Sequence, residues 1–227
     1  MLYNSDVMLY QVLGSDLPFI EILALMLGYM LALIFSFSLH EFSHAFVSTK
    51  LGDPTPRQMG RLTLNPLKHI DPVGFLCLVL FGFGWAKPVS VNPVYYKHYK
   101  SGMSMVSLAG VTMNLILAFV FSGIWYFCGA SVSASSNMFM VFLTFFLYFM
   151  VAINLSLFVF NLLPIYPLDG YNFLKAILPP NNKFISFLER YGTIILLIFL
   201  ITPLFDYIYN FVVGNLIKLF SGFWGLF

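Results

Sequence analysis

His40, Glu41 and His44 form an H-E-x-x-H motif near the end of a long apolar segment. Side chains four positions apart on an α-helix lie on one face about one turn apart, so both imidazoles can reach a single metal ion. Two histidines that bind zinc, with a glutamate beside them as general base, form the site of many metalloproteases. The motif therefore indicates zinc-dependent hydrolysis of peptide bonds.

The residues before the motif are suited to a lipid bilayer. Residues 22–39 carry no charged side chain, and the motif then places three ionisable groups within five residues. A charge at the bilayer centre costs about 2.5–3.5 kcal/mol on insertion scales, so these groups need partners or a water-filled cavity. Zinc is the simplest partner. If His40 and His44 only formed hydrogen bonds with neighbouring helices, the Glu41 between them would have no explanation.

The composition assigns the whole chain to the membrane. Of 227 residues, 60% are apolar and only 9% are charged, whereas a soluble domain averages about 25% charged residues. We therefore expect an all-α polytopic membrane protein that forms a single transmembrane domain over residues 1–227. Its core is expected over about 17–178, with a C-terminal span and tail over 184–227. The sequence contains no basic block with interleaved aromatic residues, which is the pattern that would indicate a nucleic-acid partner.

Apolar segments of sufficient length predict about four full transmembrane helices. They are expected at about 17–51, 104–127, 138–163 and 190–212, with a shorter helix at 170–178. Residues 73–84 are apolar but too short to span, which indicates a re-entrant element. Prolines and alternation over 85–93 favour a small extended hairpin segment near the interface. The tail over 214–227 is expected to lie along the interface.

Basic residues predict how these helices cross the membrane. Residues 1–17 and 128–137 contain no Lys or Arg. Ten of the eleven basic residues fall at the other ends of the predicted spans: Lys50, Arg57, Arg61, Lys68, Lys87, Lys97, Lys100, Lys175, Lys183 and Arg190. The positive-inside rule then places the N-terminus outside a cell membrane and those residues in the cytoplasm. His44 lies six residues before Lys50, hence about 9 Å inward, near the cytoplasmic face.

A third zinc ligand is expected, because catalytic zinc usually has three protein ligands and one open position. Residues 101–168 contain no Asp, Glu, Lys, Arg or His, and Asp169 follows them directly. Asp169 falls at a helix break at the depth expected for His44. The alternative is that Asp169 binds no metal and is simply the N-cap of the next helix. The need for a ligand at this depth favours Asp169, with His40 and His44, as ligands of one Zn²⁺ ion.

These motifs resemble those of the site-2 protease family (M50) of intramembrane zinc metalloproteases. HEFSH on the first helix is followed by GDPTPRQMGRLTLNPLKHIDP, GWAKPVSVNP, SLAGVTMNL and FNLLPIYPLDG, in the family's order and over about residues 35–175. Having no PDZ or regulatory domain, the chain is similar to a minimal bacterial-type subgroup. One departure is AGVTMN, because the family often has Pro after Ala-Gly.

The resemblance implies roles for individual residues. It implies His40, His44 and Asp169 as zinc ligands and Glu41 as catalytic base. Asn161 matches a polar position beside the site in related members, which implies a role in holding the substrate backbone or the oxyanion. An Asn within a span is also often only an interhelical hydrogen-bonding residue. Asn161 and Asn154 are the candidate substrate-binding residues. For Asn154 and Asn114 the same two roles, substrate binding or an interhelical hydrogen bond, are open, and their signal is weaker than that of Asn161.

The expected function is therefore intramembrane proteolysis, including regulated intramembrane proteolysis. The expected partners are transmembrane-helix protein substrates and the lipid bilayer. The carbonyl groups of a transmembrane helix are hydrogen-bonded, so the substrate must unwind locally. Pairing with residues 85–93 is one way to hold it. Two alternatives are a catalytically silent zinc-containing scaffold and a metal transporter. Glu41 argues against the scaffold, and the lack of ionisable groups over 101–168 argues against transport. No oligomeric state is predicted.

Overall fold

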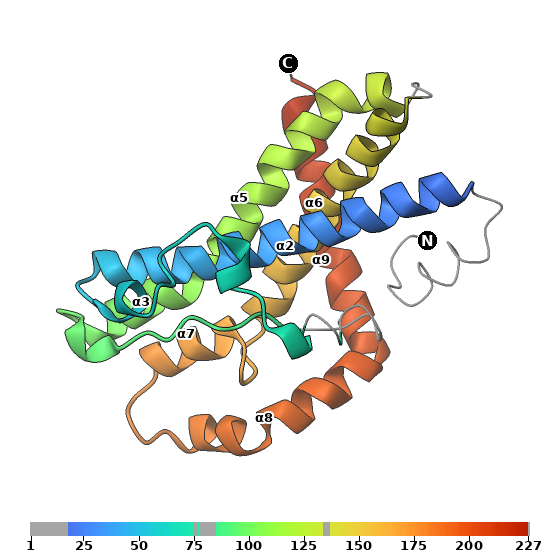
Figure 1. Ribbon diagram of the computed structural model, residues 1–227. Coiled ribbons are helices and arrows are strands. Elements are labelled where there is room, and N and C mark those ends of the chain that lie inside the picture. The colour runs from blue at the N-terminus through green and yellow to red at the C-terminus, as the bar shows by residue number, and fades with distance from the viewer. Residues whose placement is uncertain (1–17, 75–76, 78–84, 134–136, 227) are drawn as a thin grey trace.

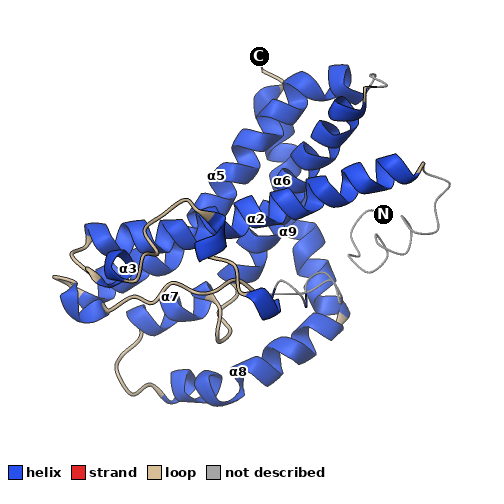
Figure 2. Ribbon diagram, in the orientation of Figure 1, coloured by secondary structure: helices blue, strands red, loops and turns tan. Residues whose placement is uncertain are grey.

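The computed structural model describes residues 18–74, 77, 85–133 and 137–226. Within these residues the chain is built from helices and contains no β-strand (Figure 2). Four of these helices contain stretches long and apolar enough to cross a membrane: α2 (Phe19–Lys50), α5 (Tyr99–Ser133), α6 (Met138–Leu162) and α8 (Lys183–Ile201). The expected all-α polytopic membrane fold is confirmed.

Helices α2, α5 and α6 pack against one another in the centre of the molecule (Figure 1). One buried cluster joins α2 to α6 through Leu25, Ala32, Leu33, Phe149, Met150 and Ile153. Gly28 lets the two helices approach closely, since a Cβ atom there would lie 3.0 Å from the backbone nitrogen of Phe146. Small residues at such contacts are typical of helices that pack within membranes.

A capping residue and a proline account for the two ends of helix α6. The Asn137 side chain caps its start by accepting a hydrogen bond from the Phe139 backbone N–H at 2.9 Å. Pro164, which lacks a backbone N–H, lies just beyond its end. The chain then turns into the short helix α7 (Asp169–Ile177), which packs against α5 and α6. This turn places Asp169 at the first position of α7, beside the central helices.

The C-terminal part differs from the predicted single span over 190–212. The chain forms two helices, α8 and α9 (Pro203–Trp224), which are separated at Thr202. Proline would clash with the preceding turn of α8, but it fits the first turn of α9. The tail expected along the interface is also different, since Phe220 and Trp224 of α9 pack against Phe119 of α5. Figure 1 shows α9 rising beside α5.

In the described part of the connection between α2 and α5, α3 (Thr55–Gln58) and the 3₁₀ turn η1 (Pro66–Lys68) precede the extended segment. Most of the expected re-entrant element over 73–84 lies outside the described residues. The extended segment is present, but it pairs with the preceding loop instead of folding back on itself. Ile70 and Ala86 form an isolated antiparallel bridge. A second 3₁₀ turn, η2 (Pro93–Tyr95), leads to α5.

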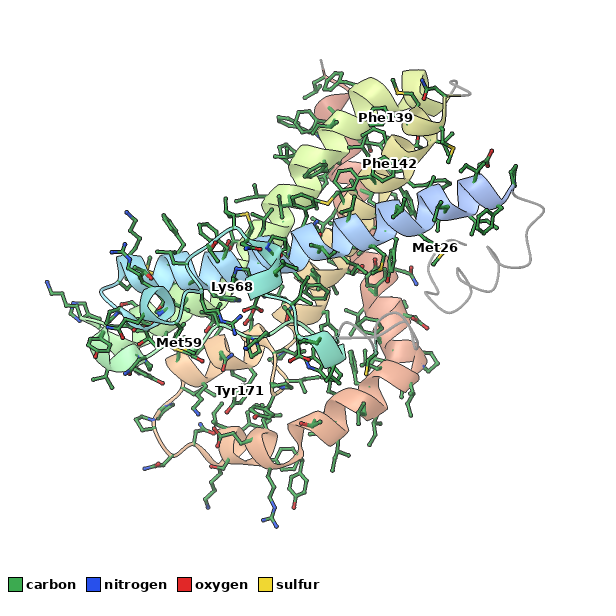
Figure 3. All side chains as sticks on the ribbon, in the orientation of Figure 1. Met26, Met59, Lys68, Phe139, Phe142 and Tyr171 are labelled. Carbon is green, nitrogen blue, oxygen red and sulfur yellow. The ribbon has the colours of Figure 1, made fainter. Side chains whose placement is uncertain are left out.

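The two ends of the molecule differ in their side chains. Figure 3 shows Lys68 and Met59 toward the end that carries α3, and Phe139 and Phe142 where α6 begins. The C-terminal end of α2 and the N-terminal end of α5 also lie near α3 (Figure 1). Basic residues that predict the orientation, such as Lys50 and Lys100, therefore gather at one end.

Candidate active site and metal centre

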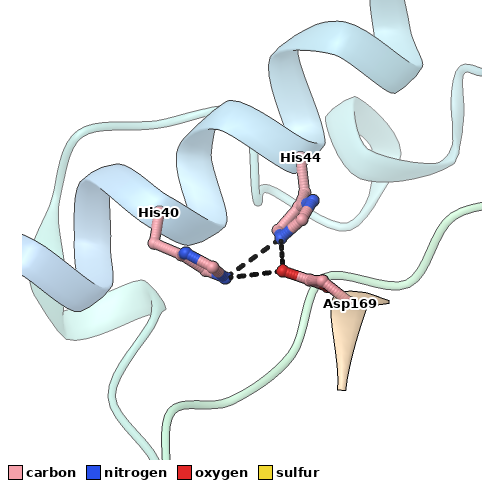
Figure 4. Close-up of side chains that lie close together, drawn as sticks. All are labelled: His40, His44 and Asp169. Carbon is pink, nitrogen blue, oxygen red and sulfur yellow. Dashed lines mark hydrogen bonds and ion pairs between the residues drawn. The ribbon is translucent and has the colours of Figure 1, made fainter. Parts of the chain in front are cut away.

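Three predicted ligands from two helices meet in one place (Figure 4). Asp169 Oδ2 on α7 lies 3.2 Å from His40 Nε2 and 3.1 Å from His44 Nε2. The two Nε2 atoms on α2 are 3.1 Å apart. Ligand atoms about 2.0–2.1 Å from a tetrahedral zinc ion lie about 3.3–3.4 Å from one another. The three atoms therefore have nearly the spacing that one zinc ion requires.

A buried chain of amides determines the tautomer of His40. Asn154 Nδ2 donates to the Met150 carbonyl at 2.7 Å, so Asn154 Oδ1 is the oxygen that accepts from Asn114 Nδ2 at 2.8 Å. Asn114 Oδ1 then faces His40 Nδ1 at 2.6 Å. An amide oxygen can only accept, so His40 Nδ1 carries the hydrogen and donates it. The other ring nitrogen, Nε2, presents a lone pair toward Asp169.

His44 has the same arrangement through a different partner. Its Nδ1 lies 2.7 Å from the Val106 backbone carbonyl, which can only accept, so Nδ1 carries a hydrogen and Nε2 is the nitrogen left to bind a metal ion. Two ring nitrogens and a carboxylate oxygen at these distances must share either a proton or a metal cation. The residues therefore fit a zinc ion, and the partners at Nδ1 are the kind that orient metal-binding histidines.

Helix α5 supports both histidines from one face. Val106, Gly110 and Asn114 are spaced four apart, as His40 and His44 are on α2. Gly110 lies between the two supporting contacts, and a Cβ atom there would come closer than 3.0 Å to ring atoms of both histidines. Glycine is thus the residue that lets α5 approach the site.

Glu41 lies beside the ligands and lines the same cavity. Its Oε2 accepts a hydrogen bond from the Val89 backbone N–H at 2.9 Å. The cavity has a volume of about 700 Å³ and is lined mainly by apolar and aromatic side chains of α2, α5, α6 and α9. A mostly apolar cavity with a few convergent polar groups is typical of binding sites.

The two candidate substrate-binding asparagines lie in different surroundings. Asn161 lines the cavity together with Asp169, and its Nδ2 donates to the Leu157 carbonyl one turn back at 3.1 Å. Asn154 is 0% exposed and is bonded to Asn114, Met150 and the Ser36 hydroxyl. The structure therefore brings Asn161 to the cavity and places Asn154 behind His40.

The sequence did not identify several groups that contact the site, and it identified one of them only as a weak candidate. Asn114 was a weak candidate, and Gly110 and the backbone groups of Val106 and Val89 were not identified. A signal for the first two does exist, since small and polar residues repeat every four positions on α5. Backbone groups leave no such signal, because every residue carries them.

Comparisons with known proteins point to one family. The model of the family described as "Peptidase family M50" matches residues 129–200. "Putative zinc metalloprotease YwhC" of Bacillus subtilis is 40% identical over 204 residues, which cover 88% of this chain and 93% of that protein. "Putative zinc metalloprotease Rip2" of Mycolicibacterium smegmatis is 34% identical over 182 residues, which cover 75% of this chain and 65% of that protein. No solved structure matches the chain.

Proposed function

This chain belongs to peptidase family M50, the site-2 proteases, and from that premise we propose that it cleaves transmembrane segments of other membrane proteins. Its relatives are named as zinc metalloproteases, which supports a zinc-dependent peptidase. The observation that carries the proposal is the convergence of His40 Nε2, His44 Nε2 and Asp169 Oδ2 beside Glu41 in a cavity among apolar helices.

His40, His44 and Asp169 would hold one zinc ion. When bound, zinc lowers the pKa of its water toward about 7 and polarises the carbonyl oxygen of a substrate. Asp169 contributes a negative charge, which suits a divalent cation among two neutral imidazoles. The amide chain behind His40 and the Val106 carbonyl behind His44 keep both rings in the orientation that the ion needs.

Glu41 is the proposed catalytic base. It follows His40 on α2, and its carboxylate lines the same cavity as the zinc ligands, where a water molecule can bind. Glu41 takes a proton from this water as the oxygen forms a bond to the scissile carbonyl carbon. It then delivers the proton to the leaving amine nitrogen as the carbon–nitrogen bond breaks.

Asn161 is the proposed contact for the substrate backbone or the oxyanion. Its Nδ2 carries two hydrogens, and one of them is used by the Leu157 carbonyl. The second can donate to a carbonyl oxygen in the cavity. For Asn154 the amide chain supports a different role, namely holding Asn114 and through it His40.

The substrate would lie in the cavity as an extended chain, because a helix hides its carbonyl groups. The segment over 85–91 supplies one wall of the cavity. The backbone N–H groups of Lys87 and Val89 donate to His69 and Glu41, so that edge of the segment is occupied. A substrate strand would therefore pair along the other edge, where residues 86, 88 and 90 turn their backbone groups.

The proposed orientation places the N-terminus outside the cell membrane and the active site near its cytoplasmic face. Lys50 at the end of α2, Lys100 at the start of α5 and Lys68 all lie toward the end that carries α3, which supports this orientation. His44 lies on the last turns of α2, close to Lys50 at that same end. Cleavage would then occur in the part of a substrate helix nearest the cytoplasm.

Replacing Glu41 with Gln tests the proposed function. We expect Glu41→Gln to retain zinc, because the ligands stay, and to lose at least about 100-fold in turnover, because the base is gone. Zinc content and cleavage of a transmembrane-helix substrate in lipid vesicles are measured together. Glu21→Gln, at the other end of α2, is the matched control and should cleave normally.

The same experiment separates the alternatives. Equal cleavage by the Glu41→Gln variant and the unaltered protein would refute the role of Glu41. A scaffold would retain zinc without cleaving any membrane substrate in either form. Zinc flux across the vesicle that survives the substitution, without proteolysis, would favour a transporter.

A further inference from the structure

The extended segment over 85–92, which we term the strap, contacts the proposed catalytic base. Its Val89 backbone N–H donates to Glu41 Oε2 at 2.9 Å. Strap residues also line the cavity beside Glu41, namely Trp85, Ala86, Pro88, Val89 and Val91. Holding Oε2 in this way leaves the other carboxylate oxygen for a water molecule. The position of the strap therefore decides where the carboxylate of Glu41 points.

The strap is fastened on both sides of Val89. On one side the Lys87 backbone N–H donates to the His69 carbonyl at 2.8 Å, beside the bridge between Ile70 and Ala86. His69 is itself 0% exposed, with its Nε2 2.8 Å from the Thr63 carbonyl. On the other side the Asn92 backbone N–H donates to Asp53 Oδ2 at 2.7 Å.

Asp53 links the strap to the helix that carries the motif. It is 0% exposed, and its Oδ2 accepts from the Ser48 hydroxyl of α2 at 2.7 Å as well as from Asn92. Its Oδ1 accepts from the Thr55 backbone N–H at 2.9 Å. Burial alone would raise the pKa of Asp53, but the hydrogen bonds from Asn92, Thr55 and Ser48 outweigh burial and lower that pKa. Asp53 is therefore ionised at neutral pH.

The two oxygens of Asp53 have separate tasks. Oδ1 forms the local turn to Thr55 after Gly52, whose φ of +103° suits glycine. Oδ2 forms the contact to Asn92, 39 residues away. An Asn at position 53 keeps an oxygen for the turn, but it presents an N–H₂ group to the N–H of Asn92. Two donors cannot bond to each other, so Asp53→Asn removes the contact to Asn92, whereas the Ser48 hydroxyl, which also bonds to Oδ2, can turn and accept from the new N–H₂ group.

We propose that Asp53 is a positioning residue for catalysis: it fixes the strap so that the Val89 backbone N–H orients Glu41 toward the attacking water. The inference rests on the proposed proteolysis. Asp53 does not contact the ligands, so zinc binding does not depend on it. Loss of the strap contact should lower kcat, because Glu41 then samples orientations that cannot take the proton. Substrate affinity should change much less.

Asp53→Asn and a matched control test this role. The control is Asp71→Asn, because Asp71 Oδ1 accepts from the Val73 and Gly74 backbone N–H groups in a local turn. In zinc-loaded protein we expect Asp53→Asn to lower kcat about tenfold, with KM and zinc content unchanged. Hydrogen exchange over residues 85–92 should accelerate in Asp53→Asn and stay unchanged in Asp71→Asn.

A second variant removes the strap's donor without touching Asp53. Val89→Pro deletes the backbone N–H that donates to Glu41 Oε2. We expect a similar fall in kcat with zinc retained, and little further fall when Val89→Pro and Asp53→Asn are combined, since both break one chain of contacts.

The outcomes separate this inference from the proposed function. Unchanged kcat in Val89→Pro, or a fall in Asp53→Asn explained by lost zinc, would overturn the positioning role and leave the protease assignment intact. If Asp53→Asn does not fold, Val89→Pro still decides. No cleavage by the unaltered zinc-loaded protein would overturn both.

Discussion

At the scale of single residues, the metal centre depends on where each ring nitrogen carries its hydrogen. The chain from Met150 through Asn154 and Asn114 leaves His40 no choice of tautomer. Asn114 and Asn154 are both 0% exposed, so water cannot replace a missing member easily. Buried polar groups of this kind are stable only when each one has a partner.

Replacing Asn114 should therefore weaken metal binding. Asn114→Ala leaves His40 Nδ1 without an acceptor and frees the ring to rotate or to change tautomer. Loss of such a supporting partner typically costs about 10–100-fold in metal affinity. Competition with a chromogenic zinc chelator measures this loss. The control is Asn215→Ala, because the exposed side chain of Asn215 donates to the Phe211 carbonyl within α9. Equal zinc affinity of Asn114→Ala and the control would contradict the argument.

Residue types and spacing predict the ligands better than the groups that support them. His40 and His44 could be paired from the sequence because the helical period fixes their geometry. Asp169 followed because residues 101–168 contain no Asp, Glu, Lys, Arg or His. Asn114 was harder to assign, since an Asn in a span has several ordinary uses. The hydrogen bond of Val89 could not be predicted, because it belongs to the backbone.

At the scale of elements, apolar length predicted α2, α5 and α6 well, because a span needs about 20 residues. The division of α8 from α9 was missed even though Pro203 was visible. Proline inside a membrane helix can produce either a kink or an end, and tertiary contacts decide between them. Here Tyr209 and Val213 of α9 pack into the cluster with Ala118 and Leu155, which draws α9 alongside α5 and α6.

Helix α7 presents Asp169, and in addition to its contacts with α5 and α6 it has a buried contact with α8. Tyr171 points from α7 toward α8 (Figure 3) and is 2% exposed in a cluster with Ile185 and Leu188. Tyr171→Ala should therefore loosen α7, with a loss of about 3–5 kcal/mol in unfolding free energy as for other buried aromatics. It should also reduce zinc retention.

Lys175→Met provides the contrast on the same helix. Lys175 pairs with Glu189 of α8, but both side chains are more than two-fifths exposed. Exposed ion pairs contribute little, so this variant should retain zinc and unfold at nearly the normal temperature. Thermal unfolding and zinc content of both variants in the same detergent make the comparison. Equal losses in the two variants would show that packing at Tyr171 does not hold α7.

At the scale of the whole molecule, the metal centre joins segments that are distant in the chain. Residue 169 meets the α2 motif 125 residues earlier, and α5 supports the histidines from a third direction. Sequence patterns could not reveal this three-sided arrangement, because they describe each helix separately. The prediction of a single span over 190–212 was wrong for the same reason, because the pattern does not show how α8 and α9 pack against other helices.

Zinc should therefore stabilise the whole bundle. Without zinc, the contact between α2 and α7 at this site depends on hydrogen bonds between the imidazoles and the carboxylate of Asp169. Zinc at 100 times its Kd should raise the unfolding free energy by about 2.7 kcal/mol. Chelation should lower Tm, and added zinc should restore it. Glu41→Gln should keep this response because its ligands are intact, whereas His44→Ala should lose most of it. A Tm independent of zinc in the unaltered protein would mean that the three side chains do not share an ion.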